Sequence, residues 1–378
     1  MEASVAPLRG AAARIASALG SAGVTLDGPA PQDIRIRNPR FFTRVAALGS
    51  LGFGESYVDG DWECDRIDEA VCRIVRAGLN RPGRSVRELA RRAAALLTNP
   101  GRAARAFEIG ERHYDLGNDL FERMLGKRMV YSCAYWKDAA DLDAAQEAKL
   151  DLVCWKLRLK PGMRLLDIGC GWGGLACYAA DRFRVSVLGI TVSREQRDRA
   201  RAAAGSLPVT IELIDYRSLD AGTFDAVASL GMFEHVGRKN YGTFLDVVRR
   251  HLAEDGLFLL HTIGGNTSLF TTDPWIERHI FPNSLIPSLA QIAFAAEGRF
   301  VVEDMHNFGA DYDRTLLAWH ANVEAHRPEL EARYGERFLR MWRYYLLSCA
   351  GAFRARYNNL WQIVLSPRGL PGGYSAPR

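Results

Sequence analysis

The sequence predicts an α/β fold, a doubly wound parallel sheet preceded by a smaller, mainly helical N-terminal domain. From residue 163 onward, short apolar runs alternate with amphipathic stretches, which is the pattern of repeated strand–helix–strand units. The first apolar run leads into a glycine-rich turn, Gly169 to Gly174. Such a turn opens a ligand site at the carboxyl edge of a parallel sheet. The first hundred residues lack the alternation, so we expect two domains, 1–105 and 106–378.

The composition excludes several classes of protein. Hydrophobic residues make up 48% of the 378 residues and charged residues 25%, values typical of a soluble globular protein and not of a disordered, collagen-like or coiled-coil chain. No apolar stretch reaches the roughly 20 residues of a membrane span, and no signal peptide is readable. The seven cysteines have no paired or zinc-finger spacing. We therefore expect reduced thiols, no metal site and a cytoplasmic location.

The N-terminal part carries a concentrated positive charge. Residues 8–24 predict a short helix, and an irregular stretch is expected through 49–54. Ser85-Val86-Arg87-Glu88 has the spacing of a capping box and predicts the start of a helix that ends at 99–101. Nine arginines and one acid lie within 73–105, although the whole chain has a net charge of only +5. This basic segment is a candidate surface for an anionic partner.

The second part gives the strands and helices of the sheet in order. Apolar runs predict strands at 163–168, 185–190, 209–214, 224–229 and 256–261. Helical patterns lie at 173–183, 194–204 and 240–252. After a proline-containing, loop-rich stretch, a strand at 300–304, a helix at 313–325 and an apolar run at 362–365 complete the expected fold.

The glycine-rich turn identifies the type of ligand. A dinucleotide site would have G-x-G-x-x-G and an acid about 20 residues later. Here the spacing is G-x-G-x-G preceded by Asp167, and the later position falls on Thr191-Val192-Ser193. D-x-G-x-G-x-G in this context indicates a class I S-adenosylmethionine (SAM) methyltransferase with a Rossmann-like sheet. Asp215, after the third strand, lies where such folds contact the adenine.

Two polar residues follow the next strands. Glu234 comes after the fourth strand and His261 ends the fifth, so both project toward the glycine turn. A single histidine at a strand end is more often structural, but two polar groups that converge on a cofactor site favour a catalytic role. No D/N-P-P-Y/F motif follows the fourth strand, which argues against a nucleic-acid methyltransferase. No serine-hydrolase or zinc-protease motif is present.

Longer motifs identify a family. They are Leu51-Gly52-Phe53-Gly54-Glu55-Ser56-Tyr57, His113 to Asp119, Tyr131-Ser132-Cys133-Ala134-Tyr135-Trp136, Leu166 to Gly174, Phe233-Glu234-His235, His261 to Gly264 and Phe308 to Asp313. With these motifs in this order, the chain closely resembles the bacterial cyclopropane-fatty-acyl-phospholipid synthases over almost its whole length. It resembles the mycolic-acid cyclopropane synthases more distantly.

The resemblance implies a reaction and its residues. The methyl group of SAM is transferred to the cis double bond of an unsaturated acyl chain in a phospholipid, and loss of a proton closes a cyclopropane ring. The implied base is a bound bicarbonate, held by Cys133, Glu234, His261, Ile263 and Tyr312, with Cys133 and Ile263 contributing backbone groups. The SAM contacts implied are Tyr131, Ser132, Gly169, Gly171, Thr191, Ser193, Gln196 and Tyr216. They add to Asp167, which precedes the glycine turn, and to Asp215, which follows the third strand. Aromatic loops should exclude water, although core packing is an equal alternative for Trp275.

The resemblance also implies membrane phospholipids as partners, a homodimer, and peripheral attachment to the inner face of the cytoplasmic membrane, without nucleic acid. The candidates for membrane contact are Arg84, Arg87, Arg91 and Arg92, whose alternative role is a solvated helix face. Three other functions stay open. A related lipid methyltransferase would give a methyl-branched or hydroxylated chain. A methyltransferase of soluble small molecules would leave the Cys133 and Tyr312 motifs unexplained. A non-catalytic lipid- or nucleic-acid-binding protein would not need the glycine turn.

Overall fold

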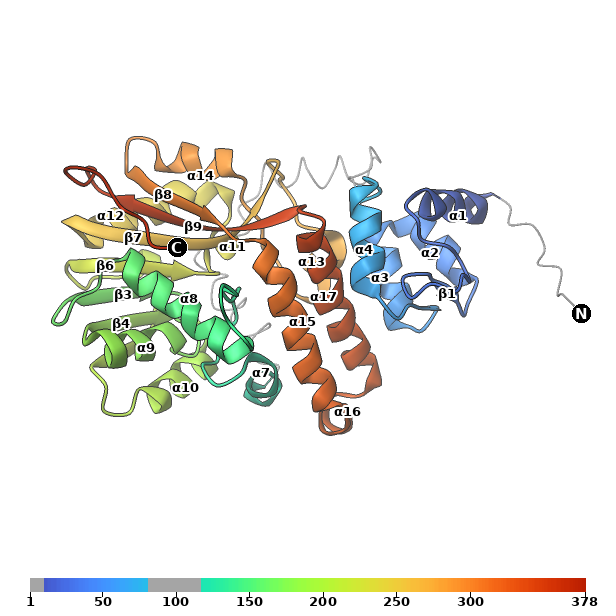
Figure 1. Ribbon diagram of the computed structural model, residues 1–378, viewed down its shortest axis with the longest axis horizontal. Helices are drawn as coiled ribbons and strands as arrows, with labels where there is room; N and C mark the ends of the chain where they lie inside the picture. Colours follow the sequence, from blue (N-terminus) through green and yellow to red (C-terminus); the bar gives the residue numbers. More distant parts are fainter. Residues whose placement is uncertain (1–9, 81–116) are drawn as a thin grey trace, which may run out of the picture.

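The computed structural model describes residues 10–80 and 117–378, which form a sheet-containing unit, a layer of long helices and a small N-terminal helical unit (Figure 1). The capping box at Ser85, the candidate membrane arginines Arg84, Arg87, Arg91 and Arg92, and the expected boundary between residues 105 and 106 lie outside the described residues. Within the described ranges, no helix combines the length and apolar character needed to cross a bilayer.

The main sheet has seven strands in the order β5-β4-β3-β6-β7-β9-β8. Their bounds are β3 Arg164–Ile168, β4 Ser186–Thr191, β5 Val209–Leu213, β6 Phe224–Leu230, β7 Leu252–Gly265, β8 Val301–Asn307 and β9 Asn358–Ser366. Strands β3 to β7 pair in parallel, as the sequence predicts. The order reverses between β3 and β6, which places a crevice beyond the carboxyl end of β3.

The expectation of a fully parallel sheet is wrong for β9, which pairs antiparallel with both β7 and β8. The start of β9 lies beside the ends of its neighbours, since Asn358 is opposite Gly265 and Trp361 is opposite Asn307. The helices between β8 and β9 therefore leave from and return to the same edge of the sheet. Because the chain re-enters the sheet at that edge, β9 must run in the direction opposite to that of β7 and β8.

Helices cover both faces of the sheet (Figure 1). One face carries α8 Leu142–Lys156, α9 Gly174–Phe183 and α10 Arg194–Ala204, and the other carries α12 Tyr241–His251 and α14 Leu289–Ala296. Strand alternation divides the core between them: Leu165 packs with the residues of α8 and α9, whereas Leu166 and Ile168 pack with those of α12. The helices predicted at 173–183, 194–204 and 240–252 are confirmed. The proline-rich stretch also contains two helices that the sequence did not reveal, α13 Pro274–His279 and α14.

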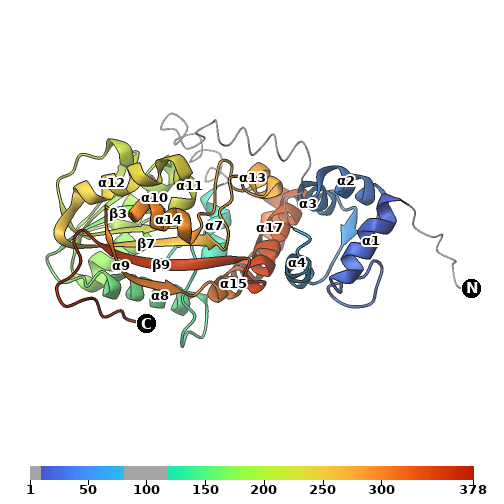
Figure 2. The same ribbon diagram turned by 90° about the horizontal axis from the view of Figure 1, so that it is seen from above.

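The N-terminal unit packs on the long helices. It consists of α1 Ala11–Ser21, β1 Arg35–Ile36, α2 Arg40–Leu48, α3 Ser50–Val58, β2 Trp62–Glu63 and α4 Ile67–Arg76. The helical layer consists of α7 Asn118–Leu125, α15 Ala310–Ala325, α16 Arg327–Tyr334 and α17 Glu336–Arg354. Figure 2 shows α4 and α3 beside α17. A single apolar cluster includes Trp62 from the first group and Trp342 from the second, so the two share one core.

The irregular stretch expected at 49–54 is wrong, because these residues turn from α2 into helix α3. Gly49 has φ of 58° and links the two helices. The other glycines in this helix permit close packing: a Cβ on Gly52 would overlap the Arg44 carbonyl, and one on Gly54 would meet the Trp275 ring. Three glycines in six residues suggested a loop, but here they allow a helix to approach its neighbours.

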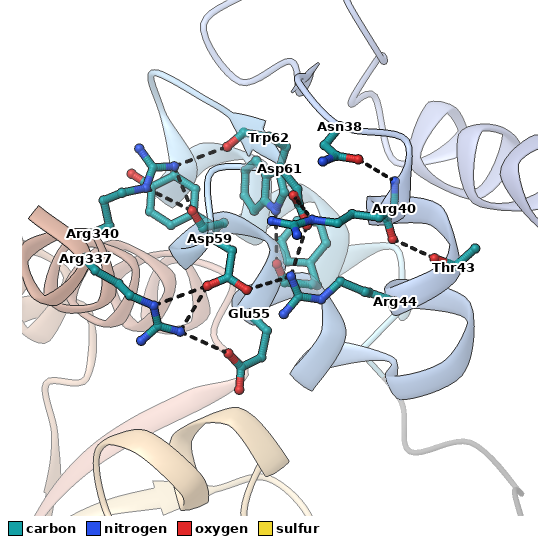
Figure 3. A network of polar contacts seen from close by, with 12 residues as sticks. Asn38, Arg40, Thr43, Arg44, Glu55, Asp59, Asp61, Trp62, Arg337 and Arg340 are labelled. Atoms are coloured by element: carbon teal, nitrogen blue, oxygen red, sulfur yellow. Dashed lines mark hydrogen bonds and ion pairs between the residues drawn. The ribbon is translucent and has the colours of Figure 1, made fainter.

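Charged contacts tie the N-terminal unit to α17 (Figure 3). Arg337 donates to Asp59 at 3.0 Å, and Asp59 also accepts from Arg44 at 2.8 Å. At the other end of α17, Arg354 lies 2.7 Å from Asp68 of α4. Burial alone would raise the pKa of Asp68, but its hydrogen bonds to arginines lower it to about 2. These pairs fix the orientation of the unit against the helical layer.

Candidate active site

The glycine turn forms the floor of a cavity at the switch point of the sheet. β3 ends at Ile168, and Gly169, Gly171 and Gly173 follow with φ of 83°, 55° and 83°. A Cβ on Gly169 would lie 2.8 Å from the Met232 Cβ, so the turn and the residues after β6 approach too closely for any side chain. The turn leads directly into α9, whose N-terminal N–H groups point toward the cavity.

Nine of the ten residues expected to bind SAM line this one cavity. They are Tyr131, Ser132, Asp167, Gly169, Gly171, Thr191, Gln196, Asp215 and Tyr216. The tenth, Ser193, caps α10 instead, and its Oγ accepts from the Gln196 N–H at 3.2 Å. The Thr191 hydroxyl donates to Gln196 Oε1 at 2.8 Å. The Ser193 N–H donates to the Thr191 hydroxyl at 3.2 Å, so Ser193 contacts two lining residues without lining the cavity itself.

Two other lining residues, Arg217 and His235, were not predicted from the sequence as site residues. Arg217 forms a two-armed ion pair with Asp215, with both nitrogen–oxygen distances 2.7 Å, and its guanidinium lies 5.0 Å from the centre of the Tyr216 ring. His235 is half-buried, desolvation of its imidazole lowers its pKa to about 4, and its ring lies 5.6 Å from that of Phe281. The available signals were the family motif that contains His235 and the position of Arg217 two residues after Asp215.

Glu234 lies at the start of α11 Phe233–Val236, immediately after β6. Its Oε1 accepts the backbone N–H of Ile263 at 2.6 Å. Its Oε2 is buried without a protein partner. Burial raises the pKa of Glu234 to about 7, against the opposing hydrogen bonds from the Ile263 N–H, from its own N–H and from the Thr262 side chain. The carboxyl group is thus fixed at one oxygen and has the other available for a ligand.

His261 presents a second buried polar atom. It is fully buried on β7, and Gln362 Nε2 on the neighbouring β9 lies 3.3 Å from its Nδ1. With the amide donating to Nδ1, the neutral ring carries its proton on Nε2, which has no protein partner. Burial, Lys149 and Lys156 hold the pKa of His261 well below its usual range. His261 is therefore a neutral donor.

Cys133 and Tyr312 complete the expected set. Cys133 is fully buried, which raises the pKa of its thiol, and its Sγ lies 3.2 Å from the Ala134 carbonyl oxygen, to which the thiol donates. Tyr312 of α15 is buried against the Phe353 ring, 4.5 Å away, and interacts electrostatically with Cys133 and Glu234. The structure thus gathers residues from segments that are almost 180 positions apart in the chain.

The expected anion ligands do not themselves line the cavity. Their chain neighbours do: Ser132 precedes Cys133, and His235 follows Glu234. The Ile263 N–H donates to Glu234 and orients that carboxyl group, and the predicted backbone contact of Ile263 with the anion stays a prediction. Trp275 also lies outside the cavity, packed 4.6 Å from the Tyr344 ring in the core beside α3. The site therefore has a cavity lined by most of the predicted SAM residues, and buried polar residues, two of them next to lining residues in the chain, that do not line it.

Comparisons with known proteins agree with this arrangement. The family model described as mycolic acid cyclopropane synthetase matches residues 102–363. Cyclopropane-fatty-acyl-phospholipid synthase from Escherichia coli (strain K12) is 55% identical over 367 residues, covering 97% of this chain and 96% of that protein. The solved structure of the cyclopropane synthase MmaA2 from Mycobacterium tuberculosis is 32% identical with a TM-score of 0.65, covering 68% of this chain and 97% of that one. A mycolic acid cyclopropane synthase complexed with SAH and CTAB has the same identity and coverage and a TM-score of 0.64.

Proposed function

The chain belongs to the mycolic acid cyclopropane synthetase family and is a SAM-dependent methyltransferase, and we propose that it forms cyclopropane rings on the unsaturated acyl chains of membrane phospholipids. The curated relative from Escherichia coli, with 55% identity across nearly the whole chain, supports this substrate class. The mycobacterial synthase complexed with SAH, the demethylated form of SAM, supports the cofactor.

The observation that carries the proposal is a buried polar pair, Glu234 and His261, beside a SAM-type cavity. An alkene is itself the nucleophile toward a methyl donor, so the site needs no activated side chain. Consistent with this, burial raises the pKa of the Cys133 thiol and keeps it protonated. When bound, SAM supplies the methyl group, and bicarbonate supplies the base that takes the proton lost on ring closure.

The polar groups beside the cavity fit a bicarbonate ion. Glu234 Oε2 can accept the hydroxyl hydrogen of such an anion, and His261 Nε2–H can donate to one of its oxygens. The Ile263 N–H keeps the Glu234 carboxyl group oriented for this contact. Tyr312 adds a phenol whose raised pKa keeps it a neutral donor. Unpartnered donors and acceptors in a buried place are costly unless a ligand satisfies them.

The aromatic walls exclude water from the reacting atoms. Tyr131 lines the cavity, and its hydroxyl is 2.7 Å from that of the buried Tyr345. The Phe281 ring lies 6.4 Å from that of Tyr131 and lines the same cavity. A carbocation formed on the acyl chain would be captured by water as an alcohol, so a dry, aromatic enclosure favours ring closure.

We further propose that residues 1–105 contact the lipid surface, that the protein associates with the inner face of the cytoplasmic membrane, and that it forms a homodimer. The basic segment would attract anionic lipid by about 1 kcal/mol per arginine near the surface. Replacing Arg87, Arg91 and Arg92 with Ala should weaken sedimentation with anionic vesicles at low salt. Unchanged sedimentation would contradict the role of this segment. Light scattering coupled to size exclusion should give the mass of two chains, and a monomer mass would contradict the dimer.

The central test is product analysis. The purified protein is incubated with SAM and vesicles of a monounsaturated phospholipid, and the fatty-acid methyl esters are examined by gas chromatography and mass spectrometry. We expect a fatty-acid ester that is heavier than the starting ester by one CH₂ unit. It should not take up hydrogen under mild conditions that reduce a double bond. A methyl-branched or hydroxylated ester would contradict the proposed product and would indicate a related lipid methyltransferase instead. If SAM binds but the lipid is unchanged, the methyl acceptor is not a phospholipid acyl chain.

A further inference from the structure

Helix α8 buries two lysines on one face. Lys149 and Lys156 are seven residues apart, which is two turns, and both have no exposed surface. A fully buried lysine is rare and costly unless its ammonium is paired. Lys156 lies 3.6 Å from Asp304 and 3.2 Å from His306, both on β8. The surroundings of Lys149 are different, and they belong to the active site.

Lys149 and a neighbouring amide hold the segment that contains Tyr131, Ser132 and Cys133. The Lys149 ammonium donates to the Ser132 hydroxyl at 2.8 Å. Gln146, one turn earlier on α8, donates its amide N–H to the Ser132 carbonyl at 3.0 Å and to the Val130 carbonyl at 3.3 Å. Ser132 lines the SAM cavity, and Cys133 is one of the expected anion ligands. Lys149 is therefore hydrogen-bonded to a residue of the cavity wall that directly precedes an expected anion ligand.

The expected anion site lacks a positive charge of its own. Glu234 is an acid, His261 is neutral, and Cys133 and Tyr312 are protonated in their buried places. An anion taken from water into such a place needs a nearby cation. Both α8 lysines interact electrostatically with His261, but Lys149 also interacts with Cys133 and hydrogen-bonds to Ser132, the residue before it, which brings it within range of this site.

Lys149 also faces the cofactor cavity through Asp167, the acid at the start of the glycine turn. The two interact electrostatically, and Asp167 Oδ2 has no hydrogen-bond partner in the protein. Burial lowers the pKa of Lys149 to about 7, and burial likewise raises that of Asp167 to about 7. The Lys149 side chain therefore interacts electrostatically with the acid of the predicted cofactor site and with Cys133 of the anion set, while Ser132 fixes its position.

We propose that Lys149 is a positioning residue whose ammonium, held by Ser132, supplies the positive charge that retains the anion beside Glu234 and His261. This inference rests on the proposed function, because bicarbonate is the anion considered. It adds to the expected ligand set a charge that reaches the site from α8 without direct contact with the acyl chain.

The test separates the charge from the hydrogen bond. Lys149→Gln keeps a donor for Ser132 and removes the charge, whereas Lys149→Met removes both. Lys156→Met is the matched control, because it removes a second buried lysine that acts electrostatically on His261 from the same helix face but is paired with Asp304 and His306 of β8 instead of with Ser132. Each protein is freed of dissolved CO₂, and two responses to added sodium bicarbonate are measured: turnover on monounsaturated vesicles at saturating SAM, and the thermal midpoint of the lipid-free protein. Circular dichroism verifies that each variant is folded.

We expect both Lys149 variants to need at least about tenfold more bicarbonate for half-maximal turnover and to lose most of the thermal shift. Lys156→Met should stay within about twofold of the unaltered protein. Normal bicarbonate response in Lys149→Gln would overturn the proposal, and so would an equal loss in Lys156→Met. If the unaltered protein shows no response to bicarbonate in either measurement, the anion part of the proposed function fails as well, which distinguishes the two failures.

Discussion

Replacing Glu234 with Gln tests the buried polar groups beside the cofactor cavity. The amide has almost the size of the carboxyl group, and its oxygen can still accept the Ile263 N–H that Oε1 accepts at 2.6 Å. The change falls on Oε2, the buried atom without a protein partner, where an acceptor becomes an NH₂ donor. The variant therefore removes one interaction with a ligand and preserves the one that orients the side chain.

The size of the effect follows from that single interaction. A hydrogen bond to a charged group contributes about 1.5–3 kcal/mol. Its loss in the transition state corresponds to a decrease in turnover of roughly 10- to 150-fold. SAM affinity should change by less than about twofold, because Glu234 does not line the cavity that holds the SAM residues. The expected signature is a large change in kcat beside an unaltered dissociation constant for SAM.

Turnover is followed by release of SAH in the presence of monounsaturated vesicles, and SAM binding is followed by isothermal titration calorimetry. Glu303→Gln is the matched control, because Glu303 likewise accepts a backbone N–H, that of Leu370 at 2.8 Å, at the outer strand β8. This control should keep its turnover. A parallel loss of SAM binding in Glu234→Gln would refute the separation of Glu234 from the SAM residues, and unchanged turnover would refute the role of Oε2.

Three further predictions concern the scaffold and the cofactor turn. The pKa of Asp68 is lowered to about 2, so its ionised form stabilises the fold above pH 3.8, the ordinary pKa, and this contribution is lost as the pH falls through about 2. In urea unfolding near neutral pH, Asp68→Asn should lower the free energy of unfolding by about 1–2 kcal/mol. If the difference in unfolding free energy between the two proteins does not narrow in acid, this prediction is wrong. Gly54→Ala should lower stability by about 1–2 kcal/mol, because its Cβ would lie 2.6 Å from Trp275 Nε1; an equal or higher unfolding midpoint would show that the ring moves aside at no cost. Gly169→Ala should weaken SAM binding at least about tenfold in calorimetry with the fold retained, because it strains a positive φ and meets Met232; normal affinity would mean that the turn can relax.

The sheet was predictable because its strands follow simple periodicity. Short apolar runs such as Leu165 to Ile168 have few alternative structures when helical stretches separate them. The direction of β9 could not be read in the same way, because it depends on where α15 to α17 return the chain. The helix over 50–58 was missed for a related reason: Gly52 and Gly54 disfavour a helix locally, and the packing that requires them involves Arg44 and Trp275 elsewhere in the chain.

The site shows the same division between local and long-range information. The cofactor turn has a compact motif and the family resemblance supplies further residues, so nine of the ten residues predicted to bind SAM line one cavity, although their contact with SAM stays a prediction. Lys149 carries no such signal, because a lysine in a helix is normally assigned to the solvent side. Only the packing of α8 against the sheet reveals that its ammonium is enclosed and meets Ser132. Residues that act through burial are invisible until the burial itself is known.

Burial also explains how ordinary residues acquire their roles in this site. It raises the pKa of Glu234 to about 7 and, together with the two α8 lysines, lowers that of His261, so the same enclosure brings an acid and a base toward their neutral forms. Neutral donors and acceptors can hold an anion without forming tight ion pairs that would compete for its proton. The charge is then best supplied from a distance, by an ammonium fixed on a rigid helix. Lys149 meets that requirement, since its bond to Ser132 holds it beside the site.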